Sequence, residues 1–282
     1  MNRQKSFEND KSTLYLVATP IGNLEEMTYR SVRILSEVDF IAAEDTRNTI
    51  KILNHFGIKK KLISHHEHNI EVSSKKIVEL LQEGHSIALV SDAGYPAISD
   101  PGYELVLKVI EAGFNVVPIS GANACLDALI VSGISPQPFI FYGFLNHSDK
   151  IKKKELESLK KYKETLVFYE SPHRIKKTLT LLLEYFGNRP IALCRELTKK
   201  HEEIIRGNVQ EILDIVDTIK GEMVLVVEGS KEEDEVVEFE LPLKEQVELY
   251  IEEGMTSKEA IKKVAKERNL PKNEVYAAYH IE

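Results

Sequence analysis

Short apolar runs rich in β-branched residues alternate with amphipathic helical stretches along most of this chain, and this alternation limits the fold more than any other feature. The runs that predict strands lie at residues 14–18, 40–43, 87–90, 116–118 and 139–143, with a second series at 166–169, 191–195, 204–207 and 223–227. Helical periods between them include residues 29–38, 73–82, 103–112, 122–131 and 174–185. Because apolar strands separated by helices build sheets that are covered on both faces, the pattern predicts an α/β protein with largely parallel sheets.

The alternation is interrupted twice, and the interruptions indicate the domain organisation. A charged helical segment at 146–163 is interpreted as a connector between two α/β halves, and the strands stop after residue 227. Thr256 and Glu259 predict a capping box in an all-helical tail with a helix–turn–helix outline. We therefore predict a flexible arm at 1–12, an N-terminal α/β domain at 13–145, a second α/β domain at 146–229, an acidic linker at 230–242 and a helical C-terminal extension at 243–282.

Composition excludes several classes of protein. The chain is 43% hydrophobic and 29% charged, as is usual for globular proteins, and no apolar run approaches the roughly 20 residues of a membrane span. The polar N-terminal segment has no secretory pattern, so we expect a cytoplasmic protein without a membrane partner. Cys125 and Cys194 lie in apolar segments, which predicts buried thiols and excludes a disulfide framework. A net charge of −8 argues against coating nucleic acid through bulk charge, although residues 150–163 and the C-terminal tail are locally basic.

The loop SDAGYPAISDPG at residues 91–102 is the strongest functional signal. It holds Asp92, Asp100, Gly94 and Gly102 together with two prolines, which makes it rigid and leaves its amides free for a ligand. It is too long and too rigid for a plain connector. Because ligands bind beyond the carboxyl ends of the strands in open parallel sheets, this loop is predicted to form the floor of a cofactor and substrate cleft.

Other loops after predicted strands carry polar or small residues. In AEDTR, Glu44, Asp45 and Arg47 could orient a hydroxyl or a backbone phosphate, or could form only a helix cap and a surface ion pair. In ISGANACL, Gly121 precedes a helix whose first amides are open to a ligand. The loop ATPIGNLEEMT matches neither a dinucleotide-binding fingerprint nor a P-loop.

Two further segments have competing interpretations. Glu170 and Arg174 in FYESPHR, with the cationic stretches at 150–163 and 195–207, form either a basic rim for a phosphodiester backbone or solvated turns. The His65–His68 segment SHHEHN lacks a standard metal-ligand pattern. A hydrogen-bonding substrate loop is therefore favoured there, and no metal is expected.

The motifs LYLVATPIGNLEEMT, IAAEDTR, LVSDAGYPAISDPG, FYGFL, VFYESPHR and RELTKKHEEIIRG follow one another in this order. Together they resemble the ribosomal RNA ribose-2′-O-methyltransferases of the tetrapyrrole methylase-like (class III) S-adenosylmethionine methyltransferases. The resemblance extends over residues 14–227, and the helical tail is similar to the C-terminal extension of that family.

This resemblance implies two α/β domains with a cleft for S-adenosyl-L-methionine between them, and a homodimer. It also implies methylation of the ribose 2′-hydroxyl of a cytidine in the decoding centre of 16S rRNA, in the small ribosomal subunit. The cofactor-binding residues carried over by motif are Asp92, Ala93, Gly94, Ile98, Gly121, Ala122, Asn123, Ala124, Phe144, Tyr169 and Leu193. Two departures, Tyr95 where a Thr is usual and SGANA where PGPSA is usual, affect side-chain contacts but keep the small residues of the pocket.

Methyl transfer from a sulfonium is an in-line displacement that needs alignment and a route for the hydroxyl proton. The candidates for proton handling are Glu44, Asp45 and Glu170, and those for phosphate are Arg47 and Arg174, whereas Asp92 and Asp100 are interpreted as positioning groups. Two alternatives stay open. One is a C-methyltransferase of a tetrapyrrole (corrin/porphyrin) precursor on the same scaffold. The other is a nucleic-acid-binding module whose basic tail contacts RNA, unless that tail packs in a dimer.

Overall fold

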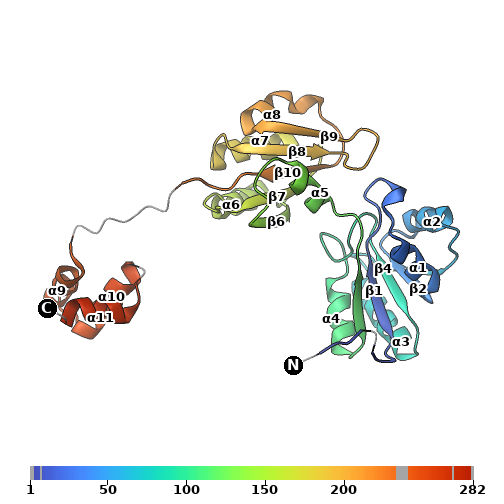
Figure 1. Cartoon of the computed structure of the whole chain (residues 1–282), viewed down its shortest axis with the longest axis horizontal. Helices are drawn as coiled ribbons and strands as arrows, with labels where there is room; N and C mark the ends of the chain where they lie inside the picture. Colours follow the sequence, from blue (N-terminus) through green and yellow to red (C-terminus); the bar gives the residue numbers. More distant parts are fainter. Residues whose placement is uncertain (1–2, 7, 233–240, 269, 281–282) are drawn as a thin grey trace. The chain divides into compact units, whose positions relative to one another are not determined.

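The computed structural model describes residues 3–6, 8–232, 241–268 and 270–280. The chain forms two compact units, Met1–Ser230 and Lys231–Glu282. The first unit contains two α/β halves, each built on a five-stranded sheet (Figure 1).

The sheet of the first half is parallel throughout, as the sequence predicts. Its strands lie in the order β3-β2-β4-β1-β5, with bounds β1 (Thr13–Val17), β2 (Phe40–Ala43), β3 (Lys61–Ser64), β4 (Ile87–Val90) and β5 (Asn115–Ile119). Helices α1 (Tyr29–Glu37) and α2 (Thr46–His55) share one core with the sheet, and α3 (Ile70–Gln82) and α4 (Tyr103–Glu111) share another. A short 3-10 helix, η1 (Leu24–Glu26), lies in the loop after β1. The carboxyl ends of β1, β2 and β4 therefore meet at one edge of the sheet, where the predicted ligand loops begin.

The sheet of the second half is mixed, so the prediction of largely parallel sheets is wrong here. Its order is β6-β7-β10-β8-β9, with bounds β6 (Phe139–Phe144), β7 (Thr165–Glu170), β8 (Pro190–Arg195), β9 (Glu203–Asn208) and β10 (Met223–Val227). Only β6 and β7 are parallel, whereas β10 runs antiparallel to both β7 and β8. The reason is the connection at residues 196–202, which contains no crossover helix, so β9 must pair antiparallel with β8.

Helices cover both faces of the second sheet. One face packs against α6 (Asp149–Leu159), α7 (Ile175–Phe186) and α8 (Val209–Ile215), which the 3-10 helix η2 (Val216–Thr218) follows. The other face packs against α5 (Ala124–Val131), whose Cys125, Ala128 and Leu129 are buried against the sheet (Figure 1). Both cysteines of the chain are buried and free.

The boundary between the halves differs from the one predicted at residue 145. Both α5 and β6 belong to the second half, so the chain crosses between the halves at residues 120–123, directly after β5. The segment 146–163 is not a connector, because its helix α6 buries Leu156 and Leu159 in the second core. The sequence predicts this helix, but its high charge obscures the apolar side that packs in the core.

The predicted terminal segments are partly described. In the arm at 1–12, Gln4 donates a side-chain hydrogen bond to Val116 O at 2.9 Å and accepts one from Val116 N at 3.0 Å, so it lies against β5. Most of the acidic linker predicted at 230–242 lies outside the described residues.

The second unit holds α9 (Leu243–Glu252), α10 (Ser257–Glu267) and α11 (Lys272–His280) around a small apolar core. The predicted capping box of Thr256 and Glu259 opens α10. No helix among the described residues is long and apolar enough to span a bilayer.

Candidate functional site

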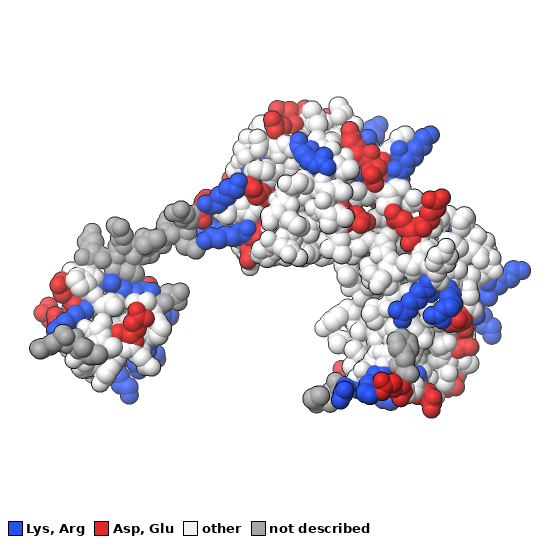
Figure 2. Space-filling view, in the orientation of Figure 1, with Lys and Arg blue, Asp and Glu red and all other residues white. Residues whose placement is uncertain are grey.

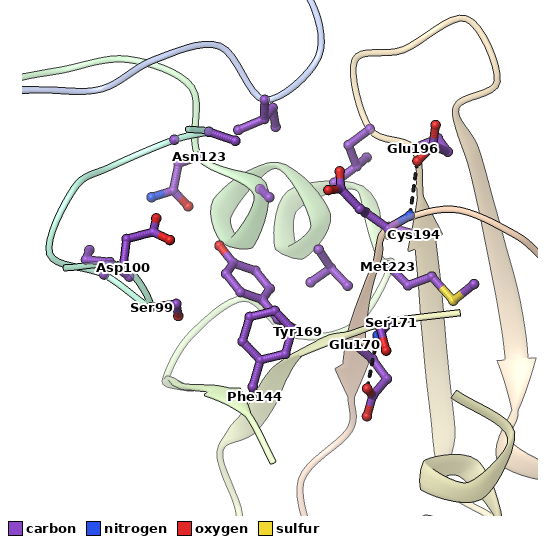
Figure 3. Close-up of a pocket in the computed structure, with 18 of the residues that line it drawn as sticks. Ser99, Asp100, Asn123, Phe144, Tyr169, Glu170, Ser171, Cys194, Glu196 and Met223 are labelled. Carbon is purple, nitrogen blue, oxygen red and sulfur yellow. Dashed lines mark hydrogen bonds between the residues drawn. The ribbon is translucent and has the colours of Figure 1, made fainter. Parts of the chain in front are cut away.

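A cavity of about 360 Å³ opens beyond the carboxyl ends of β1, β4 and β5 and is closed on its other side by the second half (Figure 3). This size falls within the range of small-molecule sites, roughly 300–1,000 Å³. The predicted central loop forms one wall through Ala93, Gly94, Tyr95, Ile98, Ser99 and Asp100. The opposite wall comes from β7, β8, β10 and the loop at 196–202. The cavity thus lies at the junction of the two halves.

The structure brings most of the predicted cofactor residues to this cavity. Those that line it are Ala93, Gly94, Ile98, Asn123, Ala124, Phe144 and Tyr169. Asp92, Gly121, Ala122 and Leu193 do not line it. Leu193 is fully buried in the core on the far face of its sheet, and its neighbour Cys194 lines the cavity instead. Because side chains alternate along a strand, Leu193 and Cys194 point to opposite faces of the sheet.

Hydrogen bonds tie the loops of the first half together behind the cavity. The amides of Thr19 and Gly94 each donate to the other residue's carbonyl, at 2.9 and 3.0 Å. The amide of Gly121 donates to the Tyr95 hydroxyl at 3.2 Å, which joins the central loop to the crossover segment. Tyr95, which stands where a Thr is usual in the related proteins, therefore has a structural role, because its longer side chain reaches the segment that contains Gly121.

Backbone strain is concentrated in the same walls. Among the described residues, the non-glycine residues with positive φ are Ala97, Ser99, Glu196 and Thr198, with φ between 50° and 69°. Two lie in the central loop and two in the loop at 196–202. Such conformations cost free energy and persist only where the surroundings enforce them, and they are often found at functional sites.

The two strained loops also contact the opposite half. A Cβ on Gly22 would collide with the Lys199 side chain, and one on Gly143 would lie 3.4 Å from Ser99 Oγ. Gly22 therefore permits a close approach between the halves, whereas the distance at Gly143 is an ordinary van der Waals contact.

Glu170 lines the cavity, but its carboxylate is held inside the second half. Its side chain is 1% exposed, accepts hydrogen bonds from Thr178 Oγ1 at 2.6 Å and from Ser171 N at 3.0 Å, and lies 3.4 Å from Arg174 Nε. Lys152, itself 2% exposed, donates to Thr178 Oγ1 at 3.2 Å. Burial lowers the pKa of Lys152, and the nearby Glu170 charge partly opposes this. Glu170 is therefore the anion of a buried polar network.

Arg174 is likewise engaged within the protein. Its guanidinium donates to the carbonyls of Leu145 at 2.5 Å and Asn146 at 3.3 Å, and thereby fixes the segment between β6 and α6. The cationic stretch at 195–207 behaves in the same way. Arg195 pairs with Glu203, Lys199 pairs with Glu196 and Glu222, and Arg206 donates to Val131 O. Figure 2 shows acidic and basic side chains intermixed on the visible face of the first unit (Met1–Ser230). The predicted basic rim is therefore occupied largely by internal pairs.

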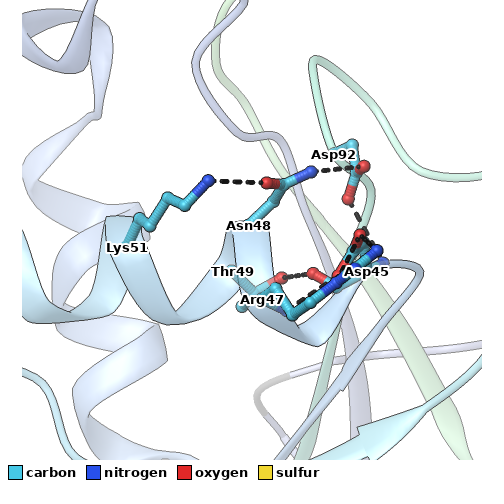
Figure 4. A network of polar contacts seen from close by, with 6 residues as sticks. All are labelled: Asp45, Arg47, Asn48, Thr49, Lys51 and Asp92. Carbon is cyan, nitrogen blue, oxygen red and sulfur yellow. Dashed lines mark hydrogen bonds and ion pairs between the residues drawn. The ribbon is translucent and has the colours of Figure 1, made fainter.

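Glu44, Asp45 and Arg47 do not line the cavity. Asp45 and Arg47 lie next to its central loop, beside Asp92 (Figure 4). Asp45 caps α2 by accepting from Arg47 N at 2.8 Å and pairs with the Arg47 guanidinium at 2.6 Å. These Arg47 hydrogen bonds lower the pKa of Asp45 to about 2. Asp92 accepts from Asp45 N at 3.2 Å and from Asn48 Nδ2 at 2.9 Å, so it joins the central loop to α2. The helix cap and ion pair, one of the two interpretations open in the sequence, are both present.

Asp100, interpreted from the sequence as a positioning group, differs from the other acidic residues of the cavity in having no donor within the described part of the chain. It lines the cavity, and none of the described residues donates a hydrogen bond to its carboxylate (Figure 3). Burial, followed by the charges of Glu44 and Asp92, raises the pKa of Asp100 to about 7. Burial and the Asp92 charge raise the pKa of Glu44 as well. The sequence identified these acidic residues, but it could not show which of them are hydrogen-bonded and which are not.

The histidine segment is built into the first half. His65 is 1% exposed and its Nδ1 lies 2.8 Å from Ser73 Oγ, and burial lowers its pKa. Within the described ranges, no group of three or more His, Cys, Asp or Glu side chains is arranged to hold a metal ion.

The fold of the first unit, a parallel α/β half joined to a mixed α/β half, occurs in known proteins. The family model of the tetrapyrrole (corrin/porphyrin) methylases matches residues 13–213. A solved structure of cobalt precorrin-4 methyltransferase superposes with a TM-score of 0.59 at 16% identity and covers 77% of this chain and 94% of its own. That likeness concerns the fold alone.

Two relatives match this chain over its full length. One from Bacillus subtilis (strain 168) is 58% identical and covers 100% of this chain and 99% of its own length. Another, from Halalkalibacterium halodurans, is 54% identical and covers 100% of both chains. Each carries the name ribosomal RNA small subunit methyltransferase I. The chain therefore belongs to the tetrapyrrole methylase family and, within it, to the ribosomal RNA small subunit methyltransferase I family.

Proposed function

We propose that this protein uses S-adenosyl-L-methionine to methylate the ribose 2′-hydroxyl of a cytidine in the decoding centre of 16S rRNA, acting in the cytoplasm on the small ribosomal subunit. The observation that carries the proposal is the full-length match to relatives named ribosomal RNA small subunit methyltransferase I. The cavity supports it. Phe144 and Tyr169 lie with ring centroids 5.5 Å apart and offer apolar surface to an adenine ring, and Asp100 offers a negative charge to a cationic ligand.

The chemistry asks little of the protein beyond alignment. When bound, S-adenosylmethionine supplies an electrophilic methyl group on a positively charged sulfur. The ribose oxygen forms the new bond to carbon, the electron pair of the old bond returns to sulfur, and the hydroxyl proton leaves to water or to a carboxylate. Holding the reacting atoms in line is worth up to roughly 7–11 kcal/mol of the barrier. The rigid loops at 91–102 and 196–202 support such positioning, because strained backbone held by hydrogen bonds does not rearrange easily.

A substrate comparison tests this proposal. We expect purified protein to transfer labelled methyl groups from S-adenosylmethionine to 30S subunits that lack the mark, at a cytidine 2′-oxygen located by alkaline-hydrolysis mapping. Precorrin should accept no label, because the relative that acts on it shares only 16% identity with this chain. Labelling of precorrin without labelling of 30S subunits would contradict the proposal and favour the tetrapyrrole alternative.

The helical unit has a surface that suits RNA. Lys258, Lys262 and Lys266 are exposed and lie four residues apart on α10, opposite its buried Ala260 and Val264. Side chains at this spacing project from one face of a helix, about 6 Å apart along its axis. We propose that this row contacts phosphates of the ribosomal RNA, and that the protein acts as a homodimer whose assembly does not require the row.

Charge reversal of the three lysines to glutamate should weaken binding to 30S subunits at least about tenfold. The remaining binding should depend less on salt, because a protein that contacts fewer phosphates releases fewer counterions when it binds. Filter binding at several salt concentrations measures both effects. The matched control is Lys59→Glu, Lys75→Glu and Lys76→Glu together, which makes the same charge change at exposed lysines of the first half, outside the cationic stretches at 150–163 and 195–207. Unchanged RNA binding with a monomeric mass in light scattering would instead assign the tail to the dimer.

A further inference from the structure

The carboxylates that line the cavity differ in how they are satisfied. Glu170 is bound by Thr178 and Ser171, and both Glu196 and Glu222 pair with Lys199 at 3.1 and 2.7 Å. Asp100, by contrast, receives no hydrogen bond from any described residue. An unpaired carboxylate in a partly apolar cavity is costly to ionise, and the cost falls when a cation binds beside it.

The charged groups around the Asp100 carboxylate do not neutralise it, so a cationic ligand could do so. Glu44, which follows β2, and Asp92, on the same loop, both add negative charge. Tyr169 of β7 faces the cavity as a neutral phenol, because burial raises its pKa to about 12. The cation of the opposite wall, Lys199, is already held by Glu196 and Glu222. Within the part of the chain that the structure describes, the charges acting on Asp100 are therefore negative, and no cation offsets them.

We infer that Asp100 distinguishes the methyl donor from the spent cofactor, by attracting the positively charged sulfonium of S-adenosylmethionine and not the neutral thioether of S-adenosylhomocysteine. The inference rests on the proposed function, because it takes S-adenosylmethionine as the ligand of this cavity. The two molecules share the adenosine, the α-ammonium and the α-carboxylate, so a difference in their binding isolates the sulfonium charge. Asp100 is thus a cofactor-specificity residue, and it would favour release of product after each methyl transfer.

The pH dependence has a definite sign. The pKa of Asp100 is about 7, so the group is mostly protonated at pH 6 and mostly ionised at pH 8. A cation binds the ionised form, which lowers the pKa of the carboxyl in the complex and releases a proton. Because the apparent affinity scales with the ionised fraction, S-adenosylmethionine should bind about tenfold more tightly at pH 8 than at pH 6. The neutral thioether should bind equally well at both.

Calorimetric titration of the full-length protein with each molecule, from pH 5.5 to pH 8.5, tests the inference. We expect the wild-type preference for S-adenosylmethionine to grow through pH 7. In Asp100→Asn the preference should be lost and binding of both molecules should be independent of pH. In Glu44→Gln the midpoint should move below pH 7, because the Glu44 charge contributes to the raised pKa of Asp100. Asp127→Asn is the matched control, because burial also raises the pKa of Asp127 but this residue does not line the cavity.

The possible outcomes separate the inference from the proposed function. If both molecules gain affinity equally with pH, Asp100 pairs with the shared α-ammonium, and the inference is wrong while the cofactor assignment stands. A preference that survives in Asp100→Asn also overturns the inference. If neither molecule binds the wild-type protein, the cofactor assignment itself fails, and the role inferred for Asp100 fails with it.

Discussion

Replacing Glu170 with alanine should lower the free energy of unfolding by about 3–5 kcal/mol, the usual effect of removing one partner from a buried charge network. The carboxylate is 1% exposed, and its loss leaves Thr178 without an acceptor and removes the larger of the two negative charges that act on the buried Lys152, so that only Asp149 remains. An uncompensated ammonium in a dry core either unfolds its surroundings or gives up its proton. Urea denaturation followed by circular dichroism measures the change.

Two further variants make this prediction specific. The double variant Lys152→Met and Glu170→Leu should recover most of the lost stability, because replacing a whole buried pair with apolar residues is often neutral or stabilising. Glu157→Ala, which removes the exposed ion pair with Lys160, should cost less than about 1 kcal/mol. If Glu170→Ala were as stable as the wild type but inactive, the role in proton handling suggested by the sequence would be supported instead.

Replacing Ala93 with phenylalanine should reduce methyl transfer at least about a hundredfold, because a displacement of about 1 Å at a reacting centre has an effect of this size. Ala93 is exposed and lines the cavity, so the larger side chain enters the ligand space and not the core. Single-turnover transfer to 30S subunits measures the rate, and thermal unfolding without ligand should change by only a few degrees. Titration with S-adenosylhomocysteine should show weakened binding.

Ala112→Phe provides the matched control, since Ala112 is also exposed but lies at the end of α4, away from the cavity. It should leave both the rate and the affinity within about twofold of the wild type, as is usual for surface substitutions. Full activity of Ala93→Phe would show that the ligand does not occupy this wall, and would move the cofactor site elsewhere.

Of the cofactor residues carried over by motif, some line the cavity and others do not, and the difference has a structural reason. Ala93, Gly94 and Ile98 line the cavity because they belong to one rigid loop whose conformation is set by its own glycines and prolines. Leu193 does not line the cavity, because its side-chain direction depends on the register of β8 in a mixed sheet. Ile21, Leu197 and Met223 were missed for a similar reason: their apolar side chains indicate a core, and only the junction of the halves exposes them to a ligand.

The sequence by itself determined what depends on neighbours a few residues apart. Four strands of the first sheet (β1, β2, β4 and β5), the capping box of Thr256 and Glu259 and the rigid central loop follow from apolar period and from hydrogen bonds within one turn, whereas β3 was not among the predicted strands. Only the tertiary structure decided that α5 covers the second sheet, that Glu170 is paired and that Asp100 is not. The free energy of a buried carboxylate is set by the donors and charges that distant segments bring to it, and no local pattern records those.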